Sequence, residues 1–209
     1  MRKIIVCSFG TFSQRVCRFL ERELPVKVTS VIDIRDLRDR TNREIREIVE
    51  EVVEPHVGEA EIIVIMDPLA TVVALDYIKS KFPEQKFVGY GQGMTKMIRE
   101  LKRVFVLVPE RIKRLEPYQR IKAACQGTEI CELDQQRWAF LVNRGWLVKE
   151  EAVKEASCVN GGKVVIYDNE LLAKEQRVEE MVGWRGEVTD MKEEMLESLK
   201  EMMGLTGWK

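Results

Sequence analysis

Two aspartates stand where a pair of carboxylates could exchange protons. The apolar residues 62–66 lead into Asp67 and Pro68, and residues 164–167 lead into Asp168. Such short apolar runs are typical of buried strands in a parallel sheet, whose ligands bind beyond the carboxyl ends of the strands. Two carboxylates in one cleft repel, so one can hold a proton and act as acid while the other acts as base. Alternatively, each aspartate only caps the helix that follows it.

Other polar groups are expected around the same cleft. Cys7 lies near the end of the first predicted strand, residues 3–8, and is the candidate third catalytic group beside the two aspartates. Arg111 could meet an anionic ligand near the end of a later strand, or it could simply be solvated. The predicted ligand-binding residues are Ser8, Gly10, Thr11, Thr71, Arg111 and Asn169.

The elements that must position these residues alternate between strand and helix. This alternation predicts parallel sheets flanked by helices, and it restarts near residue 95. We therefore predict an α/β protein with two similar lobes, in which residues 1–94 plus 190–209 form the first and residues 95–189 form the second. The charged residues 35–42 are expected to form an exposed loop that ends in a capping box.

Two helices carry expectations that the structure can test. The helix after Asp67 is expected to be amphipathic. Its inward residues would be Val72, Leu75, Ile78 and Phe82. Pro109 is expected to open a single helix. Its inward residues would be Ile112, Leu115 and Ile121.

Composition excludes several classes of function. The 209 residues are 45% hydrophobic and 33% charged, with a net charge of −1, which gives no basic surplus for nucleic-acid binding. The five cysteines match no zinc spacing, so no metal is expected. The glycine cluster Gly89–Gly93 lacks the spacing of a dinucleotide or P-loop motif, and no cofactor is expected. No apolar segment is long enough to cross a membrane, and the predicted location is cytoplasmic.

Three segments, taken in their order and spacing, resemble one family. Ile5–Gly10 is similar to an opening strand with an Asp-Ser-Gly turn, and Ile65–Thr71 is similar to an Ala-Cys-Asn-Thr-Ala-Ser segment. Val164–Leu172 is similar to a Gly-Cys-Thr-His-Tyr-Pro-Leu-Leu segment. All three are features of glutamate racemase and its relatives, the cofactor-independent aspartate/glutamate racemase superfamily. The resemblance spreads over nearly the whole chain and implies the two-lobed fold of that superfamily.

The same resemblance implies a chemistry whose decisive residues are missing. The family racemises its substrate with two opposed cysteines, one removing the α-proton and the other returning one. Aligned without gaps, Asp67 stands at the first cysteine position, Ile166 at the second and Asp168 where the family has a histidine. The family's first-turn aspartate falls on Ser8, or on Cys7 if the register slips. Because isoleucine cannot transfer a proton, racemisation by two cysteines is not expected.

Three functions remain open. The first is a member without racemase activity that binds a small carboxylate, an amino acid or a protein in the cleft between the lobes. The second is an isomerase or lyase that uses Asp67 and Asp168 as an acid/base pair on a small carboxylic or amino acid. The third is a structural partner subunit, which would associate with another protein or with a second copy through its methionine-lined last helix.

Overall fold

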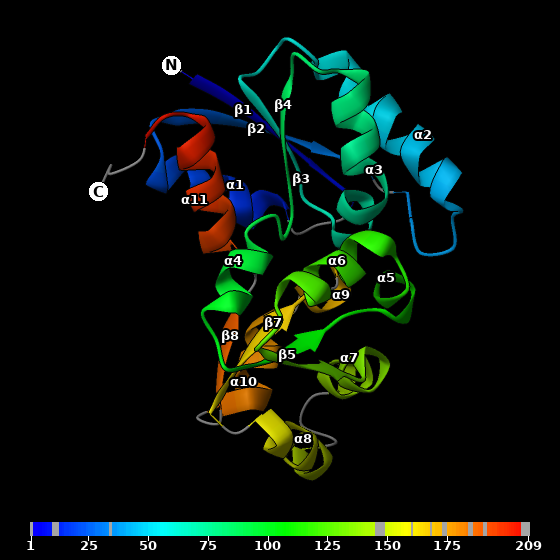
Figure 1. The fold of residues 1–209 in the computed structure, drawn as a ribbon, viewed down its shortest axis with the longest axis vertical. Helices are drawn as coiled ribbons and strands as arrows, with labels where there is room; N and C mark the ends of the chain where they lie inside the picture. Colours follow the sequence, from blue (N-terminus) through cyan, green and yellow to red (C-terminus); the bar gives the residue numbers. More distant parts are fainter. Residues whose placement is uncertain are drawn as a thin grey trace. The chain divides into compact units, whose positions relative to one another are not determined.

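The computed structural model describes residues 2–9, 13–33, 35–144, 149–159, 161–167, 169–172, 175–183, 186–189 and 192–205. The chain forms two compact units, of which one comprises Met1–Gly93 with Lys192–Lys209 and the other Met94–Met191 (Figure 1). Each unit contains one four-stranded parallel sheet with helices around it. The predicted α/β class with two similar lobes is confirmed. No helix in the described ranges is long and apolar enough to cross a membrane.

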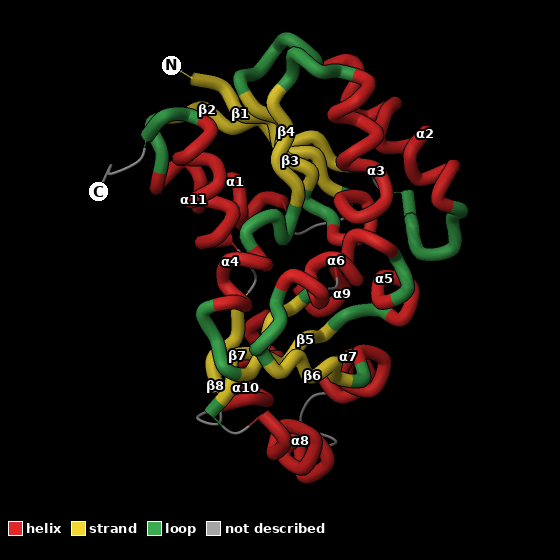
Figure 2. The backbone as a smooth tube through the Cα atoms, viewed as in Figure 1, coloured by secondary structure: helices red, strands yellow, loops and turns green. Residues whose placement is uncertain are grey.

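The first unit is built on a sheet with the strand order β2-β1-β3-β4. Its strands are β1 (Arg2–Ser8), β2 (Val26–Ile32), β3 (Ile62–Ile65) and β4 (Lys86–Gly89). Helices α1 (Ser13–Glu23) and α11 (Lys192–Met202) cover one face, and α2 (Asn42–Val53) and α3 (Pro68–Lys81) cover the other (Figures 1 and 2). Because both faces are covered, all four residues of β3 are buried, as its unbroken apolar sequence predicts.

Helix α2 begins as its sequence indicates, whereas α3 differs from its prediction. The Thr41 side chain accepts from the N–H of Glu44, and the Glu44 carboxylate accepts from the N–H of Thr41, which confirms the capping box. In α3 the expected inward face is right for Leu75 and Ile78, which are buried. It is wrong for Val72 and Phe82, which are only half-buried, while Val73 and Ala74 are buried instead. Since α3 packs against α2 as well as against β3 and β4, it buries residues toward both of these neighbours.

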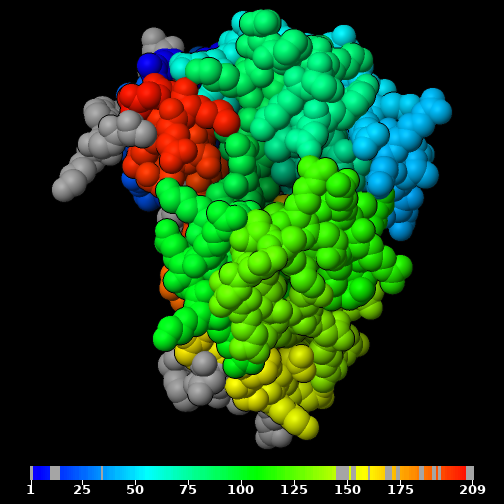
Figure 3. Space-filling model, viewed as in Figure 1, coloured from blue at the N-terminus to red at the C-terminus, as the bar shows by residue number. Residues whose placement is uncertain are grey.

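The last described helix completes the first unit. In α11, Met195 and Leu199 are buried, and the helix packs against β4 and α1. The carbonyls of its final turns accept hydrogen bonds from Arg2 Nη1, to Met203 O at 2.6 Å, and from Lys86 Nζ, to Met202 O at 2.9 Å. Cations at the C-terminal end of a helix also interact favourably with the helix dipole. Helix α11 therefore joins the surface of this unit (Figure 3), although it follows the whole second unit in sequence.

The second unit repeats the strand order of the first as β6-β5-β7-β8. Its strands are β5 (Arg103–Leu107), β6 (Glu129–Leu133), β7 (Gly162–Ile166) and β8 (Gly186–Thr189). Its helices are α4 (Met94–Arg99), α5 (Glu110–Lys113), α6 (Glu116–Ala124), α7 (Gln135–Arg144), α8 (Lys149–Ala156), α9 (Asn169–Leu172) and α10 (Glu175–Val182). The two sheets correspond strand by strand, with β3 equivalent to β7.

The single helix expected after Pro109 is instead two helices. Pro109 is the N-cap of α5, which ends at Lys113, and Leu115 is the N-cap of α6. Pro117 lies in the first turn of α6, where its missing N–H is tolerated, whereas it would break the interior of a longer helix. Ile112 is buried as predicted, whereas Leu115 and Ile121 are only half-buried. In α6 the buried residue is Tyr118.

Candidate functional site

The carboxyl ends of the strands in the first unit form one edge, which backbone hydrogen bonds hold together. The N–H groups of residues following β2, β3 and β4 donate to carbonyls near the ends of the neighbouring strands. These bonds run from Asp33 to Ser8 (2.9 Å), from Met66 to Cys7 (2.7 Å) and from Tyr90 to Ile65 (2.9 Å). This edge is where open α/β sheets bind ligands, and it gathers four of the predicted site residues, Cys7, Ser8, Asp67 and Thr71.

Asp67 is the N-cap of α3. Its Oδ1 accepts from the N–H of Ala70 at 2.6 Å, and only 3% of the residue is exposed. Pro68 follows in the first turn, where a helix needs no N–H. The helix-cap interpretation of Asp67 is therefore confirmed. The start of a helix also favours an acidic residue because of the helix dipole, so an aspartate suits this position.

The Thr71 hydroxyl connects three elements at this edge. It donates to the carbonyl of Ile65 in β3 at 3.2 Å and accepts from the N–H of Tyr90, just after β4, at 3.1 Å. Gly89 lies against the same side chain, since a Cβ added to Gly89 would come within 2.3 Å of the Thr71 methyl group. These contacts within the protein are enough to explain why Thr71 is buried. Its predicted part in ligand binding stays a prediction.

Cys7 lies inside β1 between two neighbouring strands. It pairs with Val31 of β2 and Ile65 of β3, and none of its surface is exposed. Burial raises the pKa of the Cys7 thiol to about 12. Because the thiolate is the reactive form of cysteine, Cys7 is a poor candidate for proton transfer near neutral pH. Ser8, the next residue, is also buried, with 1% exposed.

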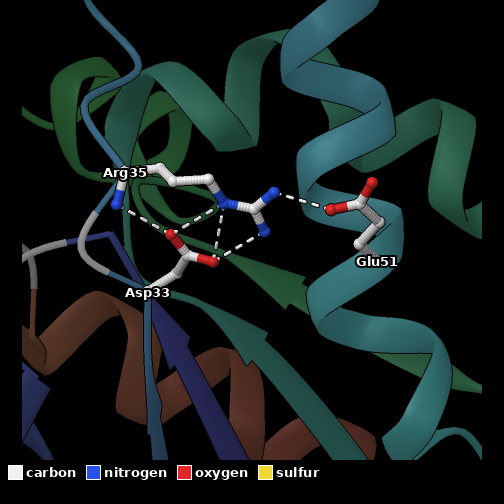
Figure 4. A network of polar contacts seen from close by, with 3 residues as sticks. All are labelled: Asp33, Arg35 and Glu51. Atoms are coloured by element: carbon white, nitrogen blue, oxygen red, sulfur yellow. Dashed lines mark hydrogen bonds and ion pairs between the residues drawn. The ribbon is translucent and has the colours of Figure 1, made fainter.

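An ion-pair network beyond the end of β2 was not anticipated from the sequence (Figure 4). The Arg35 guanidinium donates to both carboxylate oxygens of Asp33, through Nε at 3.0 and 2.9 Å and Nη2 at 2.7 Å. Its Nη1 donates to Glu51 of α2 at 2.6 Å. The predicted loop is present at residues 35–41, since Asn42 already belongs to α2, but Arg35 folds back onto the sheet edge instead of extending into solvent. The signal in the sequence was an arginine two residues after an aspartate.

The remaining predicted site residues fall in three groups. Arg111 is half-buried on α5 of the second unit. Gly10, Thr11 and Asp168 lie outside the described residues, as does the side chain of Asn169. The proposed pairing of Asp67 with Asp168 therefore stays a prediction. Over the described ranges, no group of three or more His, Cys, Asp or Glu residues could hold a metal ion.

Comparisons with known proteins bear on the fold. No family model matches the sequence, and no curated protein does. Among solved structures, glutamate racemase from Francisella tularensis in complex with D-glutamate matches with a TM-score of 0.76 and 13% identity, over 98% of this chain and 81% of that chain. A glutamate racemase isoform from Bacillus anthracis matches with a TM-score of 0.76 and 13% identity, over 99% of this chain and 83% of that chain. Aspartate racemase from Picrophilus torridus matches with a TM-score of 0.68 and 12% identity, over 98% of this chain and 95% of that chain.

This chain has the aspartate/glutamate racemase fold. The likeness covers both units, and it agrees with the resemblance that the sequence carries. Identities of 12–13% establish the arrangement of elements and leave the chemistry to the residues themselves. On this racemase fold, β3 leads into Asp67, and β7 ends at Ile166, which is fully buried.

Proposed function

We propose that this protein binds a small amino acid or carboxylic acid at the carboxyl edge of its first sheet and does not racemise it with a pair of thiols. The observation that carries the proposal is the state of Cys7, the one cysteine of this edge among the described residues. Cys7 is fully buried, and its pKa is raised to about 12. The proposal is supported by the similar structure of Francisella tularensis glutamate racemase, which is a complex with D-glutamate.

A second candidate is an enzyme that uses Asp67 and Asp168 as an acid/base pair. It is favoured by the burial of Asp67 at a strand end, where a ligand would be shielded from water. Such an enzyme would need Asp168 to face the same ligand and to hold a proton while Asp67 is charged. The predicted protein partner or homodimer is a third proposal, which the contacts within this chain do not favour over the other two.

Isotope exchange tests the main proposal directly. Purified protein is incubated in deuterated water with L-glutamate or L-aspartate, and the α-hydrogen is followed by NMR while chiral chromatography measures the D-enantiomer. We expect neither exchange nor D-enantiomer, because no described thiol at this edge is available as a base. The matched control is the Cys7→Ala variant, which should behave identically. Exchange that disappears in Cys7→Ala would overturn the proposal and make Cys7 a catalytic residue.

A further inference from the structure

Two of the five cysteines, both in the second unit, are accessible to solvent. Cys131 in β6 is half-buried, and Cys158 in the short helical turn η3 (Ser157–Val159) is exposed. The other three, Cys7, Cys17 and Cys125, are buried. Because a thiol can exchange with a dissolved disulfide only where solvent reaches its sulfur, Cys131 and Cys158 are the cysteines that can react.

Arg103 lies beside Cys131 on one face of the second sheet. It stands two residues before Phe105, which pairs with Cys131 in the parallel register, so the three side chains point to the same face. The Arg103 guanidinium donates from Nε to Cys131 Sγ at 3.5 Å, and Cys131 Sγ donates to Glu129 Oε1 at 3.5 Å. The hydrogen bond to Cys131 raises the pKa of Arg103. The charges of Glu129 and Cys158 act in the same direction, which also places Cys158 near this arginine.

The turn that carries Cys158 packs against the same face. A Cβ added to Gly162 would lie 2.4 Å from Phe105 Cε2 and 3.0 Å from the carbonyl oxygen of Val159, so the Phe105 ring reaches the end of η3. The guanidinium carbon of Arg103 lies 4.9 Å from the centroid of this ring. Arg103 therefore has Cys131 on its neighbouring strand and the segment of Cys158 beyond the Phe105 ring.

The charge of one thiol affects the other. Burial raises the pKa of the Cys158 thiol, and the charges of Glu155 and Cys131 raise it further. Cys158 Sγ donates to the carbonyl oxygen of Glu155 at 3.1 Å. Cys158 also lines a hollow in the surface of the second unit, through which a small molecule can approach its sulfur.

We propose that Cys131 and Cys158 form a redox-active dithiol, which a low-molecular-weight disulfide oxidises to a bond between their sulfurs. The Cys158 thiolate attacks one sulfur of the small disulfide, and the other sulfur leaves as a thiolate. The Cys131 thiolate then attacks Cys158 Sγ and releases the second small thiolate. The two protein thiols are oxidised, and their protons pass to the two small thiols that are formed. Arg103 donates to Cys131 Sγ and stabilises the negative charge on this sulfur as it attacks.

Oxidation of the full chain by glutathione disulfide, followed by mass spectrometry, tests the proposal. Free thiols are alkylated at successive times, and the chain is then cleaved with trypsin. We expect glutathione to appear first on Cys158 and to leave as the peptide 155–163 becomes joined to the peptide 123–137. Because the latter also contains Cys125, two variants identify its partner. Cys125→Ala should keep the link, whereas Cys131→Ser should lose it and retain glutathione on Cys158.

Three results would overturn the proposal. Stable glutathione adducts on both cysteines of the unaltered chain, without a link, would show that the two sulfurs do not meet. A link that forms only between two copies of the chain would show the same. The proposal is also wrong if glutathione disulfide modifies neither Cys131 nor Cys158. The site belongs to the second unit, so none of these results bears on the proposed function.

Variants of Arg103 test its part in the second step. Arg103→Gln should slow the loss of glutathione from Cys158 about tenfold, because the attacking sulfur loses a charged donor. Arg103→Lys keeps a cation and should restore most of the rate. The matched control is Arg120→Gln, which removes an exposed arginine paired with Glu116 in the same unit and should change nothing. Thermal melting shows whether each variant is folded. An unchanged rate in folded Arg103→Gln would overturn the role assigned to Arg103.

Discussion

Asp67 illustrates how one residue can meet two demands. Its carboxylate caps α3, which is enough to explain an aspartate before Pro68, and it also lies at the edge where this fold binds ligands. A cap needs an oxygen acceptor and nothing more, whereas a proton-transferring group needs a carboxyl in particular. Substitutions that separate acceptor from acid therefore distinguish the two roles.

We expect Asp67→Asn to retain most of the stability and Asp67→Ala to lose about 1 kcal/mol of the free energy of unfolding. The reason is that asparagine caps a helix nearly as well as aspartate, and alanine does not. Chemical denaturation of the three proteins at pH 7 measures both changes. If Asp67→Asn instead raised the stability, the charge of Asp67 would be opposed by another acid in the free protein, as the acid/base pair with Asp168 requires.

The Asp33–Arg35 pair predicts a pH dependence. Because the pKa of Asp33 is lowered in the folded protein, its stabilising contribution is present above the unfolded value of about 3.9 and is lost as the pH falls through the folded value. Asp33→Asn should therefore lower the free energy of unfolding by about 1 kcal/mol at pH 7 and by much less near pH 3. Denaturation curves of both proteins at the two pH values test this. A loss that persists unchanged at pH 3 would mean that the charge of Asp33 is unimportant.

At this scale the sequence was informative about residues that act locally. Thr41 with Glu44, and Asp67 with Pro68, are short-range signals that the structure confirms. The network around Arg35 was missed because Glu51 is sixteen residues away and a charged loop is ordinarily solvated. The role of Thr71 was missed for a related reason, since its partners lie on β3 and beyond β4.

Among the elements, α3 shows what hydrophobic periodicity can and cannot predict. The start of the helix was readable from its cap, but only Leu75 and Ile78 of its predicted inward face are buried, because α3 is covered by the sheet on one side and by α2 on another. A helix buried on two sides loses the single apolar stripe on which the amphipathic prediction depended. It packs closely against β4 where Gly89 faces Thr71 and Leu75.

We expect Gly89→Ala to destabilise the protein by about 1–3 kcal/mol, the usual cost of overpacking. An added Cβ would lie 2.3 Å from the Thr71 methyl carbon and 2.9 Å from Leu75 Cδ2, so either β4 or α3 must shift. Thr71→Ser removes that methyl group and keeps the hydroxyl that joins Ile65 to Tyr90. The double variant should therefore melt above Gly89→Ala alone. Purely additive losses would show that the strain lies elsewhere.

For the molecule as a whole, the alternation of strands and helices that restarts near residue 95 correctly indicated two units of one topology. Both sheets have the same strand order. The likeness to solved racemase structures extends over both units. What the sequence could not supply is the chemistry, since the acid that would oppose Asp67 is separated from it by most of the second unit. Apolar runs specify buried strands locally, whereas a site depends on side chains brought together from distant strands.

The division into units predicts how fragments behave. Residues 94–191 hold a continuous sheet with its own helices, and they should unfold cooperatively when produced alone. Residues 1–93 lack α11, which buries Met195 and Leu199 in the intact first unit, and should be markedly less stable. Circular dichroism during denaturation measures both fragments, and a peptide of residues 192–209 should stabilise residues 1–93. A fragment 1–93 as stable as the whole chain would contradict this role of α11.

The position of α11 has a consequence for the chain while it is being made. The four strands of the first sheet leave the ribosome early, but the helix that packs against β4 emerges only after the entire second unit. At ~5–20 residues per second, the ribosome needs roughly 5–20 s to translate Met94–Met191. During this time the surface of β4 and α1 against which α11 packs stays uncovered. During this interval the nascent first unit is a natural client for a ribosome-associated chaperone. A premature stop within the second unit would thus damage the unit that had been translated first.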